Sequence, residues 1–273
     1  MQEFRNKGVL ITGAGRGIGK RLAIGFGAAG AHVGLLARSR AEIELTQLEI
    51  EHSGGTAIRL RADVRDLEQM KTAVERMHAH FGEIHVLICS AGLMGPIGPF
   101  AQNPAAHWKE TVETNLFGVM HSCLVVVPEM TQRRSGKILV LGGSGSGRPR
   151  PNFTAYAASK SGVVRFVETL SDELRDQNVQ INCMAPGETY THMTDEILKA
   201  GEKAGQKDMD EAMQVRLTGG ILPDKQMALA MFLASQRSNH VSGKLVSVND
   251  DWKRLENSNV HSEMYTLRRV LKV

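Results

Sequence analysis

Short apolar runs alternate with longer helix-like segments along this 273-residue chain, and this alternation restricts the fold more than any other feature. Seven runs are expected to form strands, at residues 9–11, 32–36, 56–62, 84–89, 137–141, 179–184 and 244–248. Apolar strands separated by helices indicate a parallel sheet that is covered on both faces. Right-handed crossovers then give a doubly wound α/β fold of Rossmann type, in which ligands bind beyond the carboxyl ends of the strands.

The segments between these runs are predicted to be helices. In the clearest one, apolar residues recur at steps of three and four: Leu67, Met70, Val74, Met77 and Phe81. Other helices are expected up to about residue 29, up to about residue 52, and at about 104–130, 154–175 and 225–235.

The last part of the chain departs from this alternation. Residues 188–222 are charged, rich in methionine and weakly periodic, which predicts two short helices that form a substrate flap. A polar C-terminal tail is expected at about 252–273. Because there is no internal repeat and no low-complexity linker, a single domain is expected over 1–273.

Composition excludes several classes of protein. The chain is 42% hydrophobic and 23% charged, with a net charge of +4, so it is neither disordered nor basic enough for a nucleic-acid partner. Three cysteines without a CxxC pair argue against a disulfide framework. The absence of a signal peptide or a membrane-spanning run predicts a cytoplasmic protein without a membrane partner. His78 and His80 lie two residues apart, so no metal site is expected.

A glycine-rich loop follows the first predicted strand, in the sequence Thr-Gly-Ala-Gly-Arg-Gly-Ile-Gly at 12–19. A helix that begins inside this loop directs its free amides and positive dipole end at a ligand, which suits a pyrophosphate. The candidate residues are Gly13, Arg16, Gly17, Ile18 and Gly19. The alternative is a glycine-rich turn without a ligand.

The end of the second strand bears on the choice between NAD and NADP. An acidic residue there would accept hydrogen bonds from the ribose of NAD, whereas a basic one would pair with the 2′-phosphate of NADP. The chain has Ala37 followed by Arg38, and Arg16 offers a second cation. We therefore expect NADP(H), with NAD the less favoured cofactor. The alternative is that both arginines are solvated surface residues.

Two further strand ends carry candidate cofactor contacts. Asp63 is expected to accept a hydrogen bond from the adenine amino group, with Val64 beside it, because Asp66 is the better cap for the next helix. The small residues Ser90, Ala91 and Gly92 would let a ribose pack on the sheet edge.

Tyr156 and Lys160 form the strongest chemical pattern. Residues four apart lie on the same face of a helix, and a nearby cation favours the phenolate form of tyrosine. The pair can therefore exchange a proton near neutral pH. Ser144, on the loop after the fifth strand, could hold the substrate oxygen. The alternative for an isolated Tyr-x-x-x-Lys is an exposed helix face.

Taken in order, five blocks resemble the short-chain dehydrogenase/reductase family, and in particular its 3-oxoacyl-acyl-carrier-protein reductases. They are TGAGRGIG at 12–19, ADV at 62–64, SAG at 90–92, the Ser…YAASK arrangement at 144–160, and PGETYTHM at 186–193. The resemblance covers about residues 5–250.

This resemblance implies a role for each matching residue. Tyr156 would be the general acid, Lys160 would bind the nicotinamide ribose, and Ser144 would orient the carbonyl. Asn115 would hold a water in the proton relay. The segment against the nicotinamide carboxamide would include Pro186, Gly187 and Thr191. The helices at 104–131 and 154–176 resemble those through which members form homodimers and homotetramers.

Three departures from the family pattern accompany these matches. Cys89 replaces an Asn that normally ties the sheet edge together. The interval from Ser144 to Tyr156 is one residue shorter than in many members, and Ser146 is a second candidate. The usual closing Asp-Gly-Gly is replaced by Val-Asn-Asp-Asp-Trp at 248–252, which bears on C-terminal packing.

These patterns predict an NADP(H)-dependent oxidoreductase that reduces a ketone or oxidises the secondary alcohol, with a small-molecule substrate. A 3-oxoacyl thioester reductase is the commonest type that the pattern resembles. Specificity is expected to lie in the 93–103 loop and the 188–222 flap. The alternative is a non-catalytic dinucleotide-binding sensor or scaffold, against which the complete set of Asn115, Ser144, Tyr156 and Lys160 argues.

Overall fold

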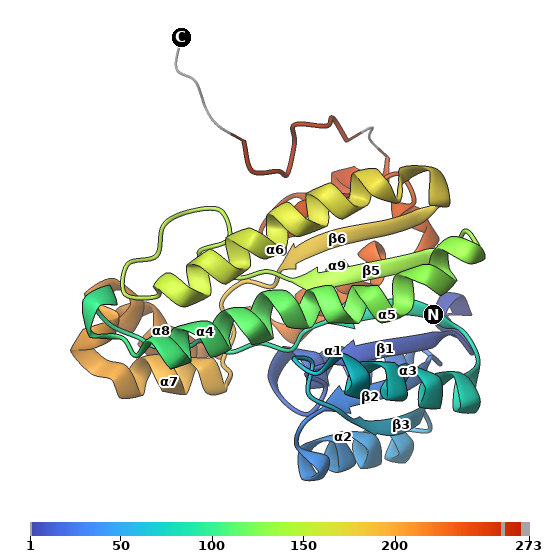
Figure 1. Ribbon diagram of the computed structural model, residues 1–273, viewed down its shortest axis with the longest axis horizontal. Coiled ribbons are helices and arrows are strands. Elements are labelled where there is room, and N and C mark those ends of the chain that lie inside the picture. Colours follow the sequence, from blue (N-terminus) through green and yellow to red (C-terminus); the bar gives the residue numbers. More distant parts are fainter. Residues whose placement is uncertain (1, 258–259, 269–273) are drawn as a thin grey trace.

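The computed structural model, which describes residues 2–257 and 260–268, contains a seven-stranded parallel sheet flanked by helices (Figure 1). The strand order is β3-β2-β1-β4-β5-β6-β7. The strands are β1 (Gly8–Thr12), β2 (His32–Ala37), β3 (Thr56–Arg61), β4 (Ile84–Cys89), β5 (Gly136–Leu141), β6 (Val179–Ala185) and β7 (Leu245–Ser247). This is the doubly wound Rossmann-type sheet that the sequence predicts.

Nine α-helices lie among the described residues and connect or flank these strands. They are α1 (Gly17–Ala28), α2 (Arg40–His52), α3 (Leu67–Phe81), α4 (Ala105–Val112), α5 (Gly118–Gln132), α6 (Thr154–Glu173), α7 (His192–Ala200), α8 (Gln206–Thr218) and α9 (Pro223–Leu233). The predicted elements are all present, and their ends differ from the predicted ends by a few residues. The predicted pair of short helices in 188–222 corresponds to α7 and α8.

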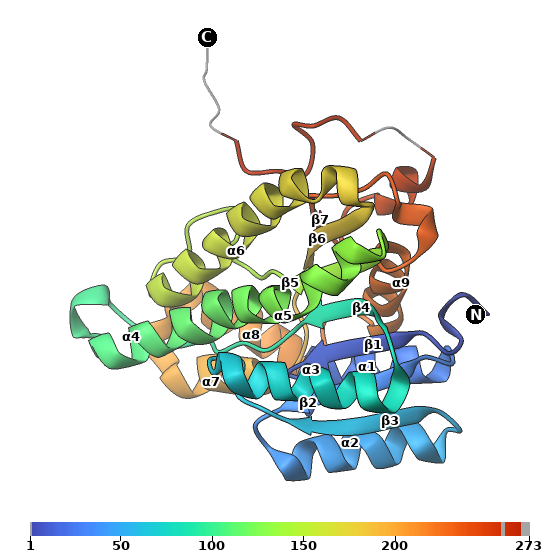
Figure 2. The same ribbon diagram turned by 45° about the vertical axis from the view of Figure 1, so that its right-hand side comes forward.

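The sheet separates two hydrophobic cores. Helices α1, α2 and α9 cover one face, while α3, α5 and α6 cover the other (Figure 2). Side chains of β1 alternate between the two cores, because successive residues of a strand point to opposite faces: Val9 and Ile11 enter one core and Leu10 enters the other. All three are completely buried. The continuous apolar run of this strand therefore reflects burial on both faces.

The predicted helix at 104–130 is interrupted in the structure. A five-residue π-helix, Glu113–Phe117, joins α4 to α5. The spacing of apolar residues does not change at this π-helix, so the sequence pattern does not predict it. Single π-turns inside α-helices occur frequently at functional sites, and Asn115 lies within this one.

The C-terminal segment is more ordered than a polar tail would be. A 3₁₀ helix, Trp252–Glu256, packs Leu255 into the core, and Trp252 stacks on Phe232 of α9. The Lys244 ammonium donates to the backbone carbonyls of residues 261, 262 and 264. These contacts fix the segment against the sheet, while 258–259 and 269–273 of the expected tail lie outside the described residues.

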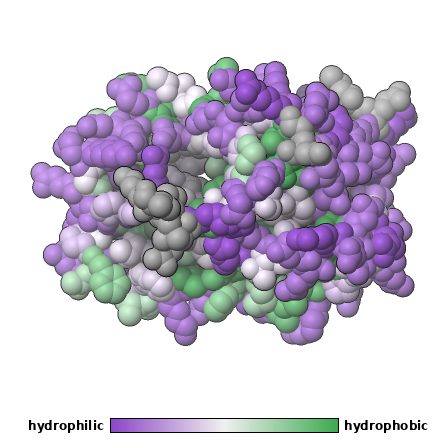
Figure 3. Space-filling view, turned by 90° about the horizontal axis from the view of Figure 1, so that it is seen from above, coloured by the Kyte–Doolittle hydropathy of each residue, from purple (hydrophilic) through white to green (hydrophobic). Residues whose placement is uncertain are grey.

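The face of the molecule seen from above is mostly polar (Figure 3). Viewed from above, hydrophilic side chains cover most of the surface and hydrophobic areas are small and separate (Figure 3). Among the described residues, no helix has the length and apolar character that a membrane crossing needs.

The arrangement of the strands determines where a ligand can bind. The strand order reverses between β1 and β4, which lie side by side although two strands separate them in sequence. Helices α4, α7 and α8 lie beyond the carboxyl ends of the strands, at the left in Figure 1. Ligands of such sheets bind in the crevice at this reversal.

Candidate active site

The glycine-rich loop joins β1 to α1 and packs closely against β4. A Cβ at Gly13 would lie 2.8 Å from the backbone of Ala91, so only glycine permits this approach. Gly17 begins α1 with a φ of +58°, a left-handed conformation that favours glycine. No side chain caps the first turn of α1, in contrast to α2 and α3. The amides of this helix end are therefore available to a phosphate.

Both predicted cofactor arginines lie at this end of the site. Arg16 approaches Glu42 at 3.7 Å, and Arg38 approaches Asp63 at 3.9 Å. The two arginine side chains are 55% and 51% exposed, so these ion pairs are loose and screened by solvent. Both guanidinium groups can turn towards a phosphate. Glu42 was not singled out from the sequence because it lies on α2, five residues beyond the strand end.

Asp63, which the sequence suggests as an acceptor for adenine, is already paired with a neighbouring arginine in the structure. Its carboxylate forms a 2.7 Å ion pair with Arg65, which also contacts Glu110 of α4. Burial acts to raise the pKa of Asp63, but the hydrogen bonds from Arg65 and the charges of Arg65 and Arg38 together outweigh it and hold the pKa below its ordinary value. Asp63 is thus a charged acceptor, and its contact with adenine stays a prediction. Asp66 caps α3 through the amide of Gln69, as expected.

Thr12 ties the sheet edge together at the position where Cys89 replaces the usual Asn. Its hydroxyl accepts hydrogen bonds of 3.1 and 3.2 Å from the amides of Ser90 and Ala91. This ties the end of β1 to the residues after β4, while Cys89 is buried among apolar side chains. Thr12 could have been identified from the sequence, because it is the polar residue that ends the first strand.

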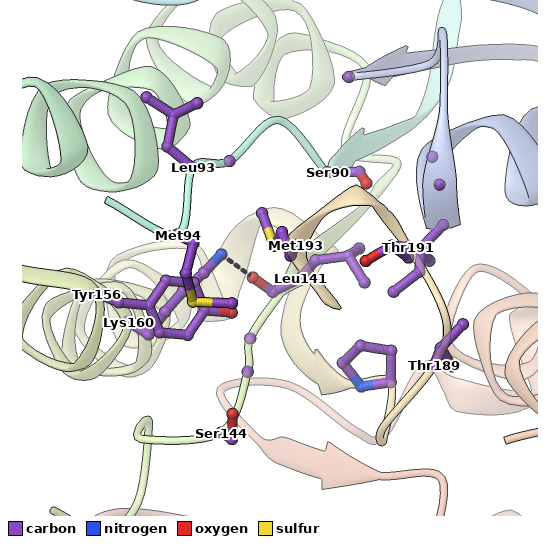
Figure 4. Close-up of a pocket in the computed structure, with 18 of the residues that line it drawn as sticks. Ser90, Leu93, Met94, Leu141, Ser144, Tyr156, Lys160, Thr189, Thr191 and Met193 are labelled. Atoms are coloured by element: carbon purple, nitrogen blue, oxygen red, sulfur yellow. Dashed lines mark hydrogen bonds between the residues drawn. The ribbon is translucent and has the colours of Figure 1, made fainter. Parts of the chain in front are cut away.

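Tyr156 and Lys160 lie on the same face of α6, as predicted, and both are buried (Figure 4). The Lys160 ammonium donates to the Leu141 carbonyl at 2.7 Å and lies 5.8 Å from the centroid of the Tyr156 ring. Burial lowers the pKa of Lys160 to about 8. Burial also raises the pKa of Tyr156 above its ordinary value, so the expected lowering of this pKa by the neighbouring cation is wrong for the protein without a ligand. The alternative of an exposed helix face is therefore wrong.

The predicted serine does not lie against the Tyr156 hydroxyl. A Cβ built on Gly143 would overlap this hydroxyl, whereas Ser144 lies farther along the loop with an exposed side chain (Figure 4). Ser146 is buried, and its hydroxyl accepts a hydrogen bond from the Gly143 amide at 3.1 Å. The one-residue shortening of the interval accounts for this shift. The role of Ser144 in orienting a carbonyl stays a prediction.

Asn115 fixes the backbone that follows β4. Its amide group donates to the Leu93 carbonyl at 2.9 Å, and its oxygen accepts from the Leu93 amide at 2.8 Å. The same amide donates to the Ser159 hydroxyl at 3.0 Å, on the helix that carries Tyr156. Asn115 is completely buried. Its side chain thus links the π-helix, α6 and the loop after β4, and its part in a water relay stays a prediction.

The segment after β6 closes over the glycine loop. Thr191 begins α7 in a capping box with Thr194, and its methyl group lies 3.5 Å from the Cβ position of Gly17. The Pro186 carbonyl accepts from the Gln226 side chain at 2.8 Å. A Cβ on Gly187 would lie 2.6 Å from Ile221, so this turn packs tightly against the chain that follows α8. The start of α7 is thereby placed beside the start of α1.

One cavity of about 990 Å³ connects these regions. All the predicted cofactor residues line it, from Gly13 to Thr191, together with Ser144, Tyr156 and Lys160; Asn115 lies behind its wall. The cavity is lined by the two arginines, by the residues around the uncapped start of α1, and by Tyr156. This shape and these groups fit a nicotinamide dinucleotide, whose pyrophosphate would meet the α1 amides.

Three residues that were not singled out from the sequence line the cavity: Arg150, Met94 of the 93–103 loop and Asp208 of the 188–222 flap. The Arg150 guanidinium forms a 2.6 Å ion pair with Asp208 of α8 and lies 3.9 Å from the centroid of the Phe153 ring. Met94 packs with Tyr156 in a small third hydrophobic cluster. Arg150 and Asp208 are 58 residues apart, so no local pattern reveals their contact. The described residues contain no cluster of side chains able to hold a metal ion.

Comparison with known proteins identifies a family. The family model described as short chain dehydrogenase matches residues 7–202. The chain is 30% identical to 2,3-dihydro-2,3-dihydroxybenzoate dehydrogenase of Bacillus subtilis, over 88% of this chain and 93% of the relative. It is 31% identical to a 3-oxoacyl-acyl-carrier-protein reductase of Thermotoga maritima, over 90% of this chain and 97% of the relative.

Solved structures share the fold. An actinorhodin polyketide ketoreductase variant with NADPH superimposes with a TM-score of 0.81 and 26% identity, covering 89% of this chain and 95% of the neighbour. A xylitol dehydrogenase with bound NAD⁺ gives a TM-score of 0.82 at 23% identity, covering 90% and 98%. Among these structures of the same fold, one contains NADPH and the other contains NAD⁺.

Proposed function

The chain belongs to the short-chain dehydrogenase family, and we propose that it reduces a ketone, or oxidises the matching secondary alcohol, with NADP(H) as its cofactor. Its relatives are named dehydrogenases and reductases, so it is an oxidoreductase acting on CH–OH or C=O groups. One observation carries the proposal: the Tyr156 hydroxyl lies at the inner end of the cavity that begins at the uncapped amides of α1.

The residues along this cavity would hold the dinucleotide. The α1 amides would bind the pyrophosphate, and Arg16 and Arg38 would pair with the 2′-phosphate of NADP. Asp63 and Val64 would contact the adenosine, while Ser90, Ala91 and Gly92 would face the ribose next to the nicotinamide. The carboxamide side would be bounded by Pro186, Gly187 and Thr191. When bound, the nicotinamide supplies or accepts a hydride.

Tyr156 would exchange the proton that accompanies the hydride. In reduction, its hydroxyl donates a proton to the carbonyl oxygen as the alcohol forms, and solvent then reprotonates the phenolate. Burial raises the pKa of this phenol, which makes the neutral, proton-donating form the resting state. The Lys160 ammonium, held by Leu141, favours the phenolate once the proton has left.

The segment 188–222 would act as the substrate flap. Helices α7 and α8 cover the inner end of the cavity and contribute Met193, Ile197 and Ala212 to its wall. An antiparallel bridge between Thr189 and Gly220 joins the two ends of the segment. Because its two ends are joined, the flap can move as one unit while the sheet stays fixed.

Consumption of NADPH against a panel of ketones tests the proposed function. The panel contains a 3-oxoacyl thioester, a cyclic diketone, a steroid ketone and a ketose, with wild-type protein and Tyr156→Phe assayed in parallel. Turnover of at least one ketone by the wild type, absent from the variant, is expected. Wild-type protein that binds NADPH tightly but consumes none with any ketone or alcohol would contradict the proposal.

We propose further that the protein forms homodimers or homotetramers through α5 and α6. Phe117, in the π-helix before α5, is 47% exposed, and Leu124 of α5 is 53% exposed. Burial of such side chains in a self-interface is favourable. Light scattering should give a mass of two or four chains, and Leu124→Glu should reduce it. A wild-type mass of one 29.8 kDa chain would contradict this.

A further inference from the structure

The position that faces the Tyr156 hydroxyl carries no side chain. It is Gly143, the residue whose Cβ would overlap this hydroxyl. In the family, a serine before the tyrosine orients the carbonyl, and the short interval between Ser144 and Tyr156 puts Gly143 in its place. Ser144 is exposed, and the buried Ser146 hydroxyl accepts a hydrogen bond from the Gly143 amide. The position that faces the Tyr156 hydroxyl therefore supplies no hydroxyl, which leaves room for another residue to act as the second hydrogen-bond donor to the substrate oxygen.

Arg150 is a cation in the cavity wall that lies beside Tyr156. Its guanidinium carbon is 5.7 Å from the centroid of the Tyr156 ring, and its side chain is only 11% exposed. Two of its nitrogens, Nε and Nη2, contact the same Asp208 oxygen at 2.8 and 2.6 Å. The third, Nη1, has only the Met94 thioether at 3.7 Å as its recorded partner among the described residues. This nitrogen retains donor capacity at a cavity wall.

The other charged and titratable groups around Tyr156 do not fill this role. Lys160, on the same helix, directs its ammonium to the Leu141 carbonyl. Cys183 of β6 is completely buried, and burial raises the pKa of its thiol to about 12. Burial raises the pKa of Tyr156, and the charge of Arg150 acts in the opposite direction. Asp208 of α8 reaches the phenol only through Arg150.

We propose that Arg150 is a further catalytic residue, whose Nη1 donates a hydrogen bond to the substrate oxygen beside Tyr156, in the place that a serine hydroxyl takes in other family members. This inference rests on the proposed function. The oxygen gains negative charge as the hydride arrives, and a fixed cationic donor in a dry site stabilises that charge. Asp208 holds the guanidinium in place from α8, so a closed flap is part of the arrangement.

Steady-state kinetics of three variants test the proposal, with the best ketone of the panel above. Arg150→Met keeps an unbranched side chain as far as the Nε position and removes the donors. Since a lost donor to a developing oxyanion costs about 10²–10³ in rate, kcat and kcat/KM should fall together by about this factor. Arg150→Lys keeps the charge and should lose less. Asp208→Asn removes the same ion pair but keeps the guanidinium, so its kcat should fall by about tenfold or less.

A second measurement needs no substrate. The chain has only three tyrosines, so the difference between the tyrosinate absorbance of a protein and that of its Tyr156→Phe counterpart isolates Tyr156. Removing a neighbouring cation disfavours the phenolate, so Arg150→Met should move this titration to higher pH, and Arg150→Lys should restore it. Thermal unfolding of each variant shows whether it is folded under the assay conditions.

The outcomes separate the inference from the proposed function. If Arg150→Met keeps kcat within about threefold of wild type, or falls no further than Asp208→Asn, Arg150 is only a structural partner of α8 and the inference is wrong. An unchanged Tyr156 titration in Arg150→Met also overturns it. If instead the wild type consumes no NADPH with any ketone, the proposed function fails, while the tyrosinate measurement still reports the contact between Arg150 and Tyr156.

Discussion

The Lys160 ammonium is held 2.7 Å from the backbone carbonyl of Leu141, at the carboxyl end of β5. This hydrogen bond fixes the cation between the sheet and α6, one turn from Tyr156. Burial lowers the pKa of Lys160 to about 8, so its charge is present at neutral pH and is lost as the pH rises through this value. The positive charge and the phenol are therefore presented to the same end of the cavity by one strand and one helix.

Tyr156→Phe tests the proton donor directly. The substitution keeps the buried ring and removes only the hydroxyl, so folding and cofactor binding should be preserved. Turnover should fall by about two to four orders of magnitude, the range for a lost general acid. Dissociation constants for NADPH, measured by fluorescence titration, provide the control. A variant that kept near-normal rates on the best substrate would show that another group delivers the proton.

The flap should change its mobility when ligands bind. Few residues anchor α8, which buries only Ala212 and Val215, and these lie outside the two cores that flank the sheet. Segments with few buried contacts open at low free-energy cost. Hydrogen exchange in 188–222 should be fast in the free protein and slow in the ternary complex, while exchange in β1 stays unchanged. Equal protection of 188–222 in both states would contradict a closing flap.

Lys137 should make stability depend on pH. Its ammonium is buried beside the Ser238 hydroxyl, and burial lowers its pKa from 10.5 to about 7. Between these values the unfolded chain binds a proton that the folded chain lacks, so this residue's contribution makes stability rise with pH, by up to about 1.4 kcal/mol per unit. Below about pH 7 Lys137 is protonated in both the folded and the unfolded chain, so the buried charge lowers the free energy of unfolding by its full amount.

Lys137→Met isolates this contribution, because every other titrating group is shared with the wild type. The variant should exceed the wild type in free energy of unfolding at pH 7, and this advantage should shrink as the pH rises towards 10.5. Urea denaturation of both proteins across this range measures the difference. A difference that stays constant with pH would mean that Lys137 keeps its proton in the folded protein.

The sheet and the Tyr156–Lys160 pair could be predicted because local sequence determines them. Burial on both faces makes each strand a continuous apolar run, and a spacing of four places two residues on one helix face. The position of the serine in the loop before Tyr156 was harder to predict, because a one-residue change in loop length shifts every side chain along the loop. Ser144 was the serine whose spacing from Tyr156 came closest to the family interval, whereas the structure places Gly143 against Tyr156.

Contacts between distant segments left no local pattern. Arg150 and Asp208 meet only because α8 folds back over the cavity, and the π-turn that positions Asn115 lies within continuous apolar periodicity. The C-terminal segment looked like a polar tail because its few apolar anchors, such as Trp252 and Leu255, are widely separated by polar residues, and because several of its contacts are backbone carbonyls with Lys244, which any sequence can supply. Sequence thus predicted the elements and their order better than the contacts that complete the substrate end of the site.

Cofactor choice should depend on the end of β2. Ala37 occupies the position where an acid would accept hydrogen bonds from the ribose of NAD, and Arg38 follows it with a half-exposed, loosely paired guanidinium. A hydrogen bond to a charged group contributes about 1.5–3 kcal/mol, which corresponds to about ten- to a hundredfold in affinity. NADPH should therefore bind at least about tenfold more tightly than NADH.

Ala37→Asp combined with Arg38→Ala should reverse this preference, because a carboxylate repels the 2′-phosphate and accepts from the free ribose hydroxyls. Arg16→Ala is the matched control: it removes the second cation, so it should weaken NADPH binding while leaving NADH binding nearly unchanged. Fluorescence titration of both cofactors into the three proteins measures each effect. Equal wild-type affinities, or tighter NADH, would show that Arg38 stays with Asp63 and solvent and makes no contact with the cofactor.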